Sequence, residues 1–125
     1  MAYVDGFVVP VPKKKLADYR KLASKSAKVW KKYGALSVME SVADDVKPGK
    51  TTSFPQSVKL KNGEVVVFSW ITYKSRKHRD QVNAKVMKDP VMASFDMKTA
   101  PFDPKTAPFD AKRMFYGGFK QLVAM

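Results

Sequence analysis

Residues Glu64 to Tyr73 read Glu-Val-Val-Val-Phe-Ser-Trp-Ile-Thr-Tyr, a run of β-branched and aromatic residues that contains neither Gly nor Pro. Such a run predicts a β-strand. In an extended chain, successive side chains alternate between the two sides. Apolar residues occupy both sides: Val66, Phe68 and Trp70 on one, and Val65, Val67 and Ile71 on the other. This strand must therefore be covered on both faces.

The length and composition predict one globular domain spanning residues 1–125. Of the 125 residues, 45% are hydrophobic and 28% are charged, which is ordinary for a globular protein. No window approaches the roughly 18 uninterrupted apolar residues of a membrane helix. The start, Met1 to Phe7, has no basic leader, so we expect no signal peptide. The absence of cysteine excludes disulfides and thiolate metal sites and fits the cytoplasm, where we expect the protein to reside.

The net charge of +13, from 24 basic and 11 acidic residues, is the unusual feature of the composition. A field of this size attracts polyanions, so binding of RNA or another polyanion through the lysine-rich surface is one functional hypothesis. Planar recognition of phosphate or guanine favours Arg, however, and only four of the basic residues are Arg: Arg20, Arg76, Arg79 and Arg113. The simpler interpretation is a solvated, solubilising surface.

The first third of the chain predicts a strand, a helix and a second strand. Tyr3 to Val11 alternates strongly and reads as the first strand. From Lys14 to Tyr33, apolar residues recur at steps of three and four, which predicts a helix with Gly34 as its C-terminal cap. This apolar stripe comprises Leu16, Tyr19, Ala23, Ala27 and Trp30. Ala35 to Val42 alternates again and predicts the second strand.

The remaining segments are two loops, a helix and a final strand. Residues 43–63 form a long connection in which Asn62-Gly63 predicts a β-arm that folds back as a hairpin. Ser75 can cap a helix from Arg76 to about Lys88. Residues 95–111 contain a duplicated heptad, Phe-Asp-Met-Lys-Thr-Ala-Pro followed by Phe-Asp-Pro-Lys-Thr-Ala-Pro. Its prolines forbid a continuous helix and predict a surface loop, with a lid over a pocket as the alternative. Arg113 to Ala124 predicts the last strand.

The order strand, helix, strand, strand, helix, strand predicts an α+β, ferredoxin-like βαββαβ fold. Right-handed crossovers place both helices on one side of a four-stranded antiparallel sheet, with the first and third strands central. The other face is left bare, although the strand from Glu64 to Tyr73 is apolar there too. A second copy packed sheet against sheet would cover it, so we expect a homodimer that forms a dimeric α/β barrel.

Six strings, in order along nearly the whole chain, carry a resemblance to a known family. They are Tyr3-Val4-Asp5-Gly6-Phe7, Val42-Ala43-Asp44-Asp45, Thr52-Ser53-Phe54-Pro55, Glu64-Val65-Val66-Val67-Phe68-Ser69-Trp70, Arg79-Asp80 with Asn83-Ala84-Lys85-Val86-Met87, and Phe109-Asp110-Ala111-Lys112-Arg113-Met114 with Tyr116-Gly117-Gly118-Phe119. Together they resemble the YbaA-like family, a bacterial family of unknown function. The resemblance implies a dimeric ferredoxin-like fold and no established activity. The same superfamily includes cofactor-free monooxygenases, an analogy of fold alone.

No catalytic motif appears in the sequence: there is no Walker loop, nucleophile elbow or dinucleotide fingerprint. A single histidine with no cysteine cannot make a zinc or haem site by itself, so we expect neither metal nor cofactor. Polar residues of the second helix and last strand could converge beside an aromatic wall to hold an anionic or carbonyl ligand. The candidate pocket residues are Trp70, His78, Arg79, Asn83, Lys112, Arg113 and Tyr116. The alternative is that Arg79 and Arg113 pair with Asp residues in loops and the aromatics are core.

Two functional hypotheses follow. In the first, the protein is a small-molecule binder or a monooxygenase-like enzyme that uses a cavity between sheet and helices; the residues alone leave open whether it is an enzyme. In the second, it is an RNA-binding or polyanion-binding module. The predicted dimer argues against the second, because it hides the sheet face that RNA-binding ferredoxin-like domains leave open.

Overall fold

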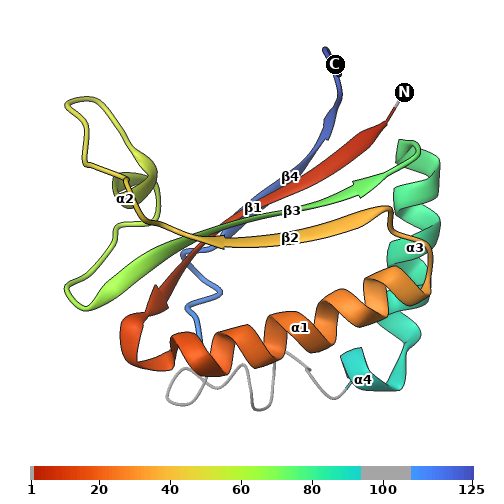
Figure 1. Cartoon of the computed structure of the whole chain (residues 1–125), viewed down its shortest axis with the longest axis horizontal. Helices are drawn as coiled ribbons and strands as arrows, with labels where there is room; N and C mark the ends of the chain where they lie inside the picture. Colours follow the sequence, from red (N-terminus) through yellow and green to blue (C-terminus); the bar gives the residue numbers. More distant parts are fainter. Residues whose placement is uncertain (1, 94–107) are drawn as a thin grey trace.

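The structure, a computed structural model, describes residues 2–93 and 108–125. It is a twisted four-stranded sheet with a layer of helices on one side (Figure 1). The strands are β1 (Tyr3–Pro12), β2 (Ser37–Val42), β3 (Glu64–Tyr73) and β4 (Phe115–Lys120). The helices are the 3-10 turn η1 (Lys13–Lys15), α1 (Leu16–Lys32), α2 (Phe54–Ser57), α3 (Arg76–Lys88) and α4 (Pro90–Ala93).

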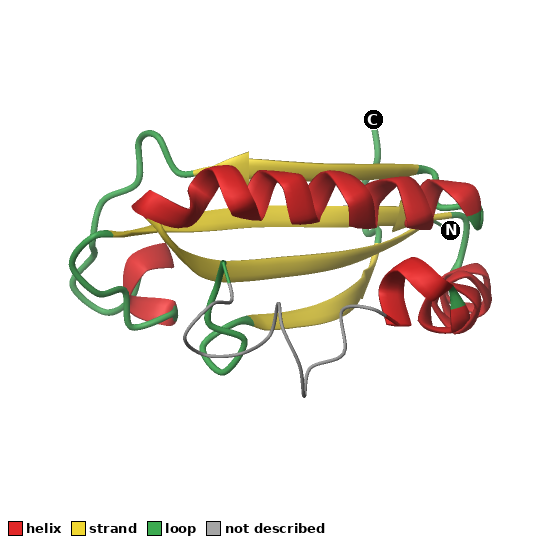
Figure 2. Cartoon of the chain, turned by 90° about the horizontal axis from the view of Figure 1, so that it is seen from below, coloured by secondary structure: helices red, strands yellow, loops and turns green. Residues whose placement is uncertain are grey.

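The sheet has the order β2-β3-β1-β4 with every neighbouring pair antiparallel. This arrangement confirms the predicted α+β fold with β1 and β3 at its centre. Helices α1 and α3 lie on the same side of the sheet, and Figure 2 shows α1 extended in front of the strands. β1, α1, β2 and β3 all lie within the first 73 residues, whereas α3 and β4 come from the rest of the chain.

The core lies between the helices and the odd-numbered residues of the two central strands. One cluster gathers Tyr3, Val29, Ala35, Ile71, Tyr73, Val82 and Val86, and a second joins Val9, Val11 and Val67 to Leu16 and Tyr19 of α1. Tyr73 is completely buried. The alternation that predicts the strands therefore also selects the side chains that face the helices.

The two main helices begin and end close to their predicted residues. Gly34 follows α1 with φ of 111°, the left-handed conformation that glycine tolerates best. The Ser75 hydroxyl accepts a hydrogen bond of 3.1 Å from the backbone N–H of His78 at the start of α3. The short α4 was not predicted; there, Oδ1 of Asp89 accepts from the N–H of Val91 at 2.9 Å.

The connection 43–63 contains a one-turn helix in place of the predicted β-arm. Ser53 caps α2, since its hydroxyl accepts from the N–H of Gln56 at 3.2 Å, and Pro55 fits the first turn of a helix. Asn62-Gly63 does form a turn, with φ of 80° at Gly63, but residues 58–60 pack down instead of pairing as a strand. Val58 is buried against Val66 and Val8, and this burial holds the segment on the sheet.

The last strand is shorter than the predicted Arg113 to Ala124. β4 spans Phe115–Lys120, because Arg113 is engaged by acidic side chains before the strand begins. Within β4, Gly118 packs closely against the Tyr3 side chain, because a Cβ atom at this position would collide with the Tyr3 hydroxyl. Most of the duplicated heptad, through residue 107, lies outside the described residues.

The face of the sheet opposite α1 and α3 carries exposed apolar side chains. Phe68 is 40% exposed on β3 and packs its ring beside Trp70, while Phe119 on β4 is 64% exposed. Met39 and Phe115 are exposed on the two edge strands. Among the described residues, cover on this face comes from the 43–63 connection, where Val58 lies over Val66 and the Phe54 ring packs edge-on against Phe68.

Candidate functional site

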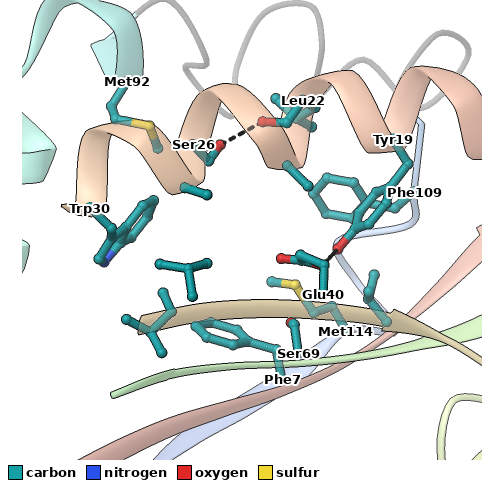
Figure 3. Close-up of a pocket in the computed structure, with 15 residues that line it drawn as sticks. Phe7, Tyr19, Leu22, Ser26, Trp30, Glu40, Ser69, Met92, Phe109 and Met114 are labelled. Carbon is teal, nitrogen blue, oxygen red and sulfur yellow. Dashed lines mark hydrogen bonds between the residues drawn. The ribbon is translucent and has the colours of Figure 1, made fainter. Parts of the chain in front are cut away.

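A cavity of about 150 Å³ lies between α1 and the sheet (Figure 3). Its described lining comes from β1, α1, β2, β3, α4 and the segment before β4. The lining residues are Phe7, Val9, Tyr19, Leu22, Ala23, Ser26, Ala27, Trp30, Val38, Glu40, Ser69, Ile71, Met92, Phe109 and Met114. In Figure 3, Trp30 and Met92 stand at one end, and Tyr19, Phe109, Glu40 and Met114 at the other. The cavity is therefore mostly apolar, with Tyr19, Glu40 and Ser69 as the polar groups of one end and Ser26 bonded to the Leu22 carbonyl along α1.

The floor of the cavity follows one row of residues across the sheet. Glu40 of β2 pairs with Ser69 of β3, and Ser69 pairs with Phe7 of β1, so the three side chains point to the same face. Tyr116 of β4 ends the row opposite Phe7, and the two rings stack with centroids 5.6 Å apart. The strand register thus sets a carboxylate, a hydroxyl and an aromatic ring side by side beneath α1.

Tyr19 links the helix to the edge strand across this end of the cavity. Its hydroxyl donates a hydrogen bond of 2.7 Å to Oε1 of Glu40. Glu40 as a residue is exposed at the sheet edge, but desolvation of its carboxyl raises the pKa of that group, although the hydrogen bond from Tyr19 opposes the rise. Burial, together with the nearby Glu40 charge, raises the pKa of the Tyr19 hydroxyl, so Tyr19 stays protonated at neutral pH and acts as the donor.

Ser69 is the most buried polar side chain of the lining. The residue is 4% exposed. Its hydroxyl makes no hydrogen bond to another described residue, and because every fully buried side-chain oxygen of the described residues has a partner, this hydroxyl keeps surface open to the cavity. Buried hydroxyls in proteins almost always have a partner. The Ser69 hydroxyl is therefore a donor and acceptor that a molecule in the cavity can satisfy.

The opposite end is fixed by hydrogen bonds behind the cavity wall. Nε1 of Trp30 donates to Oδ1 of Asn83 on α3 at 3.0 Å, and the Tyr73 hydroxyl donates to the same atom at 3.2 Å. These two bonds orient the Trp30 indole against α3. The aromatic wall at this end is thus held in place by groups that do not themselves reach the cavity.

Arg79, one of the predicted pocket residues, belongs to an ion-pair network at the start of α3. Its guanidinium binds Oδ1 of Asp5 at 2.9 Å and Oδ1 of Asp80 at 2.8 Å, and it lies over the Tyr3 ring. Burial raises the pKa of Asp5, although the charge of Arg79 opposes the rise. These contacts join α3 to β1. Arg79 pairs with aspartates, as the alternative interpretation expected, but they lie on a strand and a helix rather than in loops.

Arg113 forms a second network that holds two loops together. It binds Oε2 of Glu64 at 2.6 Å and Oδ2 of Asp110 at 2.8 Å. Its Nη1 also donates to the backbone carbonyl of Lys59 at 3.1 Å. These contacts of Arg113 with Glu64, Asp110 and Lys59, the Arg113 clamp, join the start of β3 to the turn before it and to the segment before β4.

The other five predicted residues are dispersed over the structure. Trp70 lies on the uncovered sheet face, and Lys112 is exposed in the segment before β4. Nδ1 of His78 accepts from the backbone N–H of Lys74 at 3.0 Å. Tyr116 and Asn83 come nearest to the cavity, through their contacts with Phe7 and Trp30. The side chains that line the cavity are different ones, and ligand binding by the seven stays a prediction.

Two lining residues that sequence reasoning did not select had a recognisable signal. Glu40 is the one charged residue among the alternating Leu36, Val38, Glu40 and Val42. Ser69 likewise interrupts the apolar side of the strand formed by Val65, Val67 and Ile71. A polar residue on an otherwise apolar strand face that packs against a helix marks a possible site.

Comparison with known proteins identifies the family. The sequence pattern of the family described as "Protein of unknown function (DUF1428)" matches residues 2–104. The chain belongs to this family. It is 47% identical over 123 residues to the uncharacterized protein YbaA of Escherichia coli strain K12, covering 98% of each chain. The match to YbaA of Shigella flexneri has the same identity and coverage, so the resemblance to the YbaA-like family is confirmed.

A solved structure supports the fold. The crystal structure of an uncharacterized NIPSNAP domain protein from Burkholderia xenovorans aligns over 95% of this chain and 93% of its own. The TM-score is 0.52 and the sequence identity 12%, so this likeness concerns the fold alone. Within the described residues, no three His, Asp or Glu side chains converge as metal ligands, and no helix combines the length and apolar character needed to cross a bilayer.

Proposed function

We propose that the protein is a homodimer that binds a small molecule in the cavity between α1 and the sheet. The observation that carries this proposal is the apolar cavity with Glu40, Tyr19 and Ser69 at one end. Apolar walls with a few convergent polar groups are the usual composition of a ligand site.

The size of the cavity limits the ligand. An engineered apolar cavity of roughly 150 Å³ binds benzene. At about 150 Å³, the cavity here suits a molecule of one ring rather than a dinucleotide or a lipid. If the protein is an enzyme, the same cavity would hold the substrate of a monooxygenase-like reaction. Glu40 is then the carboxylate that can accept a proton from the bound molecule.

The dimer is proposed from the uncovered face of the sheet. Phe68, Trp70 and Phe119 form an apolar surface that the described part of the chain leaves open. Contiguous exposed patches of this kind usually mark interfaces. A second copy related by a two-fold axis presents the same surface and covers it. A cytoplasmic location completes the proposal and rests on the absence of cysteine.

Methionine-methyl NMR tests the ligand cavity. Met92 and Met114 line it, whereas Met39 and Met87 are exposed elsewhere and serve as internal controls. Titration with toluene should shift the resonances of Met92 and Met114 and leave those of Met39 and Met87 unchanged. Shifts of all four together, or of none, would contradict a specific cavity ligand.

Polyanion binding is the second candidate, and the outer face of α1 favours it. Lys21, Lys25 and Lys28 are exposed on the side of α1 that faces away from the sheet, so dimerisation would leave them accessible. Contacts to phosphates give a binding constant that falls steeply with salt, with a log–log slope of about −0.9 per contact on duplex DNA. The test measures the affinity of the protein for duplex RNA at several salt concentrations. An affinity that does not change with salt would contradict this candidate function.

A further inference from the structure

Two polar side chains lie next to each other on the cavity floor, and both have unused hydrogen-bonding capacity. Glu40 and Ser69 are paired across β2 and β3, which places their Cβ atoms about 5 Å apart. Tyr19 occupies Oε1 of Glu40, and no described residue binds Oε2 or the Ser69 hydroxyl. The pair thus offers a charged acceptor and, beside it, a hydroxyl that can both donate and accept.

The surrounding walls are aromatic on several sides. Phe7 contributes to the floor, Tyr19 and Trp30 extend from α1, and Phe109 packs edge-on to Tyr19 with ring centroids 5.9 Å apart. Aromatic side chains make favourable stacked and edge-to-face contacts with another ring. A volume of about 150 Å³ accepts one such ring and little more.

From this juxtaposition, and resting on the proposed ligand-binding function, we infer that the ligand is a single aromatic ring that carries a hydroxyl group. The ring lies between Phe7 and α1. The hydroxyl donates to Oε2 of Glu40 and accepts from the Ser69 hydroxyl.

The inference predicts discrimination between two molecules of equal size. Phenol and toluene have the same number of non-hydrogen atoms, but only phenol can donate to Glu40. A hydrogen bond to a charged group contributes more than a neutral one, and a bound toluene leaves the buried Ser69 hydroxyl without a partner. Phenol should therefore bind about tenfold or more tightly than toluene.

The experiment titrates the full-length protein with phenol and with toluene while following the Met92 and Met114 methyl resonances. The same titrations are made with Glu40→Leu, Ser69→Ala and, as a control, Asp45→Leu, which removes an exposed carboxylate that does not line the cavity. If Glu40→Leu does not fold, Glu40→Gln removes the charge and keeps the shape.

We expect Glu40→Leu to abolish the preference for phenol while toluene still binds, Ser69→Ala to reduce the preference severalfold, and Asp45→Leu to change nothing. If wild-type protein binds toluene as tightly as phenol, the hydroxyl-bearing ligand is wrong but the cavity proposal stands. If neither molecule shifts Met92 or Met114, the cavity proposal fails and this inference fails with it.

Discussion

The Tyr19 hydroxyl on α1 donates to Oε1 of Glu40 on edge strand β2 at 2.7 Å, which closes one end of the cavity. Replacing Tyr19 with Phe removes this donor and keeps the ring. The pKa of Glu40 should then rise further, because the hydrogen bond lowers it in the wild type. A carbon-13 NMR titration of the Glu40 carboxyl measures the change. Tyr116→Phe is the control, since Tyr116 is 68% exposed and its hydroxyl makes no hydrogen bond to a described residue. If the pKa of Glu40 were unchanged in Tyr19→Phe, the hydrogen bond between Tyr19 and Glu40 would be contradicted.

The two adjacent glycines of β4 should respond oppositely to alanine. A Cβ atom at Gly118 would collide with the Tyr3 hydroxyl and ring, whereas a Cβ atom at Gly117 would lie 3.9 Å from a ring carbon of Phe119, an ordinary contact. Gly118→Ala should destabilise the protein by about 2 kcal/mol through overpacking. Gly117→Ala should be neutral or stabilising by a few tenths of a kcal/mol, because alanine restricts the unfolded chain. Urea unfolding of both variants gives the comparison, and equal stabilities would show that β4 does not approach Tyr3 as described.

The Arg113 clamp should govern stability in acid. Hydrogen bonds from Arg113 lower the pKa of Glu64 and of Asp110 below their usual values. This stabilisation is present above the unfolded-chain values of about 4 and is lost as the pH falls through the lower folded values. Arg113→Met should cost about 2 kcal/mol at pH 7 and less at pH 2, because the two carboxyls take up protons as the pH falls through their lowered pKa values.

Lys112→Met is the matched control for that variant, because it removes an exposed neighbouring charge outside the clamp. Unfolding curves at the two pH values measure both variants. If Arg113→Met lost as much stability at pH 2 as at pH 7, the contribution of the ion pairs would be refuted.

The uncovered sheet face should control self-association. Phe68→Lys places a charge in the proposed interface, and Met87→Lys makes the same change on the exposed surface of α3. Sedimentation at micromolar concentration should give twice 14.1 kDa for the wild type and Met87→Lys, and 14.1 kDa for Phe68→Lys. A wild type that sediments as a monomer would end the dimer proposal without affecting the cavity.

Much of the fold could be predicted because periodicity and capping are local properties. The alternation from Glu64 to Tyr73 and the stripe along α1 place each element within a few residues. The predicted β-arm is wrong: Asn62-Gly63 forms a turn, but no strand precedes it, because Ser53 caps a helical turn and Val58 packs onto the sheet. Tertiary burial overrode the local hairpin pattern.

The cavity could not be predicted because it depends on register. Glu40, Ser69 and Phe7 are far apart in sequence and meet only through the pairing of β2 with β3 and of β3 with β1. Arg79 and Arg113 are among the predicted pocket residues because they are charged, but charge alone does not distinguish a ligand site from an ion pair between elements. The more informative pattern was the single polar residue on each of two apolar strand faces.

The most direct test of the ligand site is the electron density of a crystal soaked in phenol. The account predicts one ring between Phe7 and α1, with its oxygen within hydrogen-bond distance of Oε2 of Glu40 and of the Ser69 hydroxyl. A cavity closed by side chains, or phenol bound only on the outer surface, would contradict it.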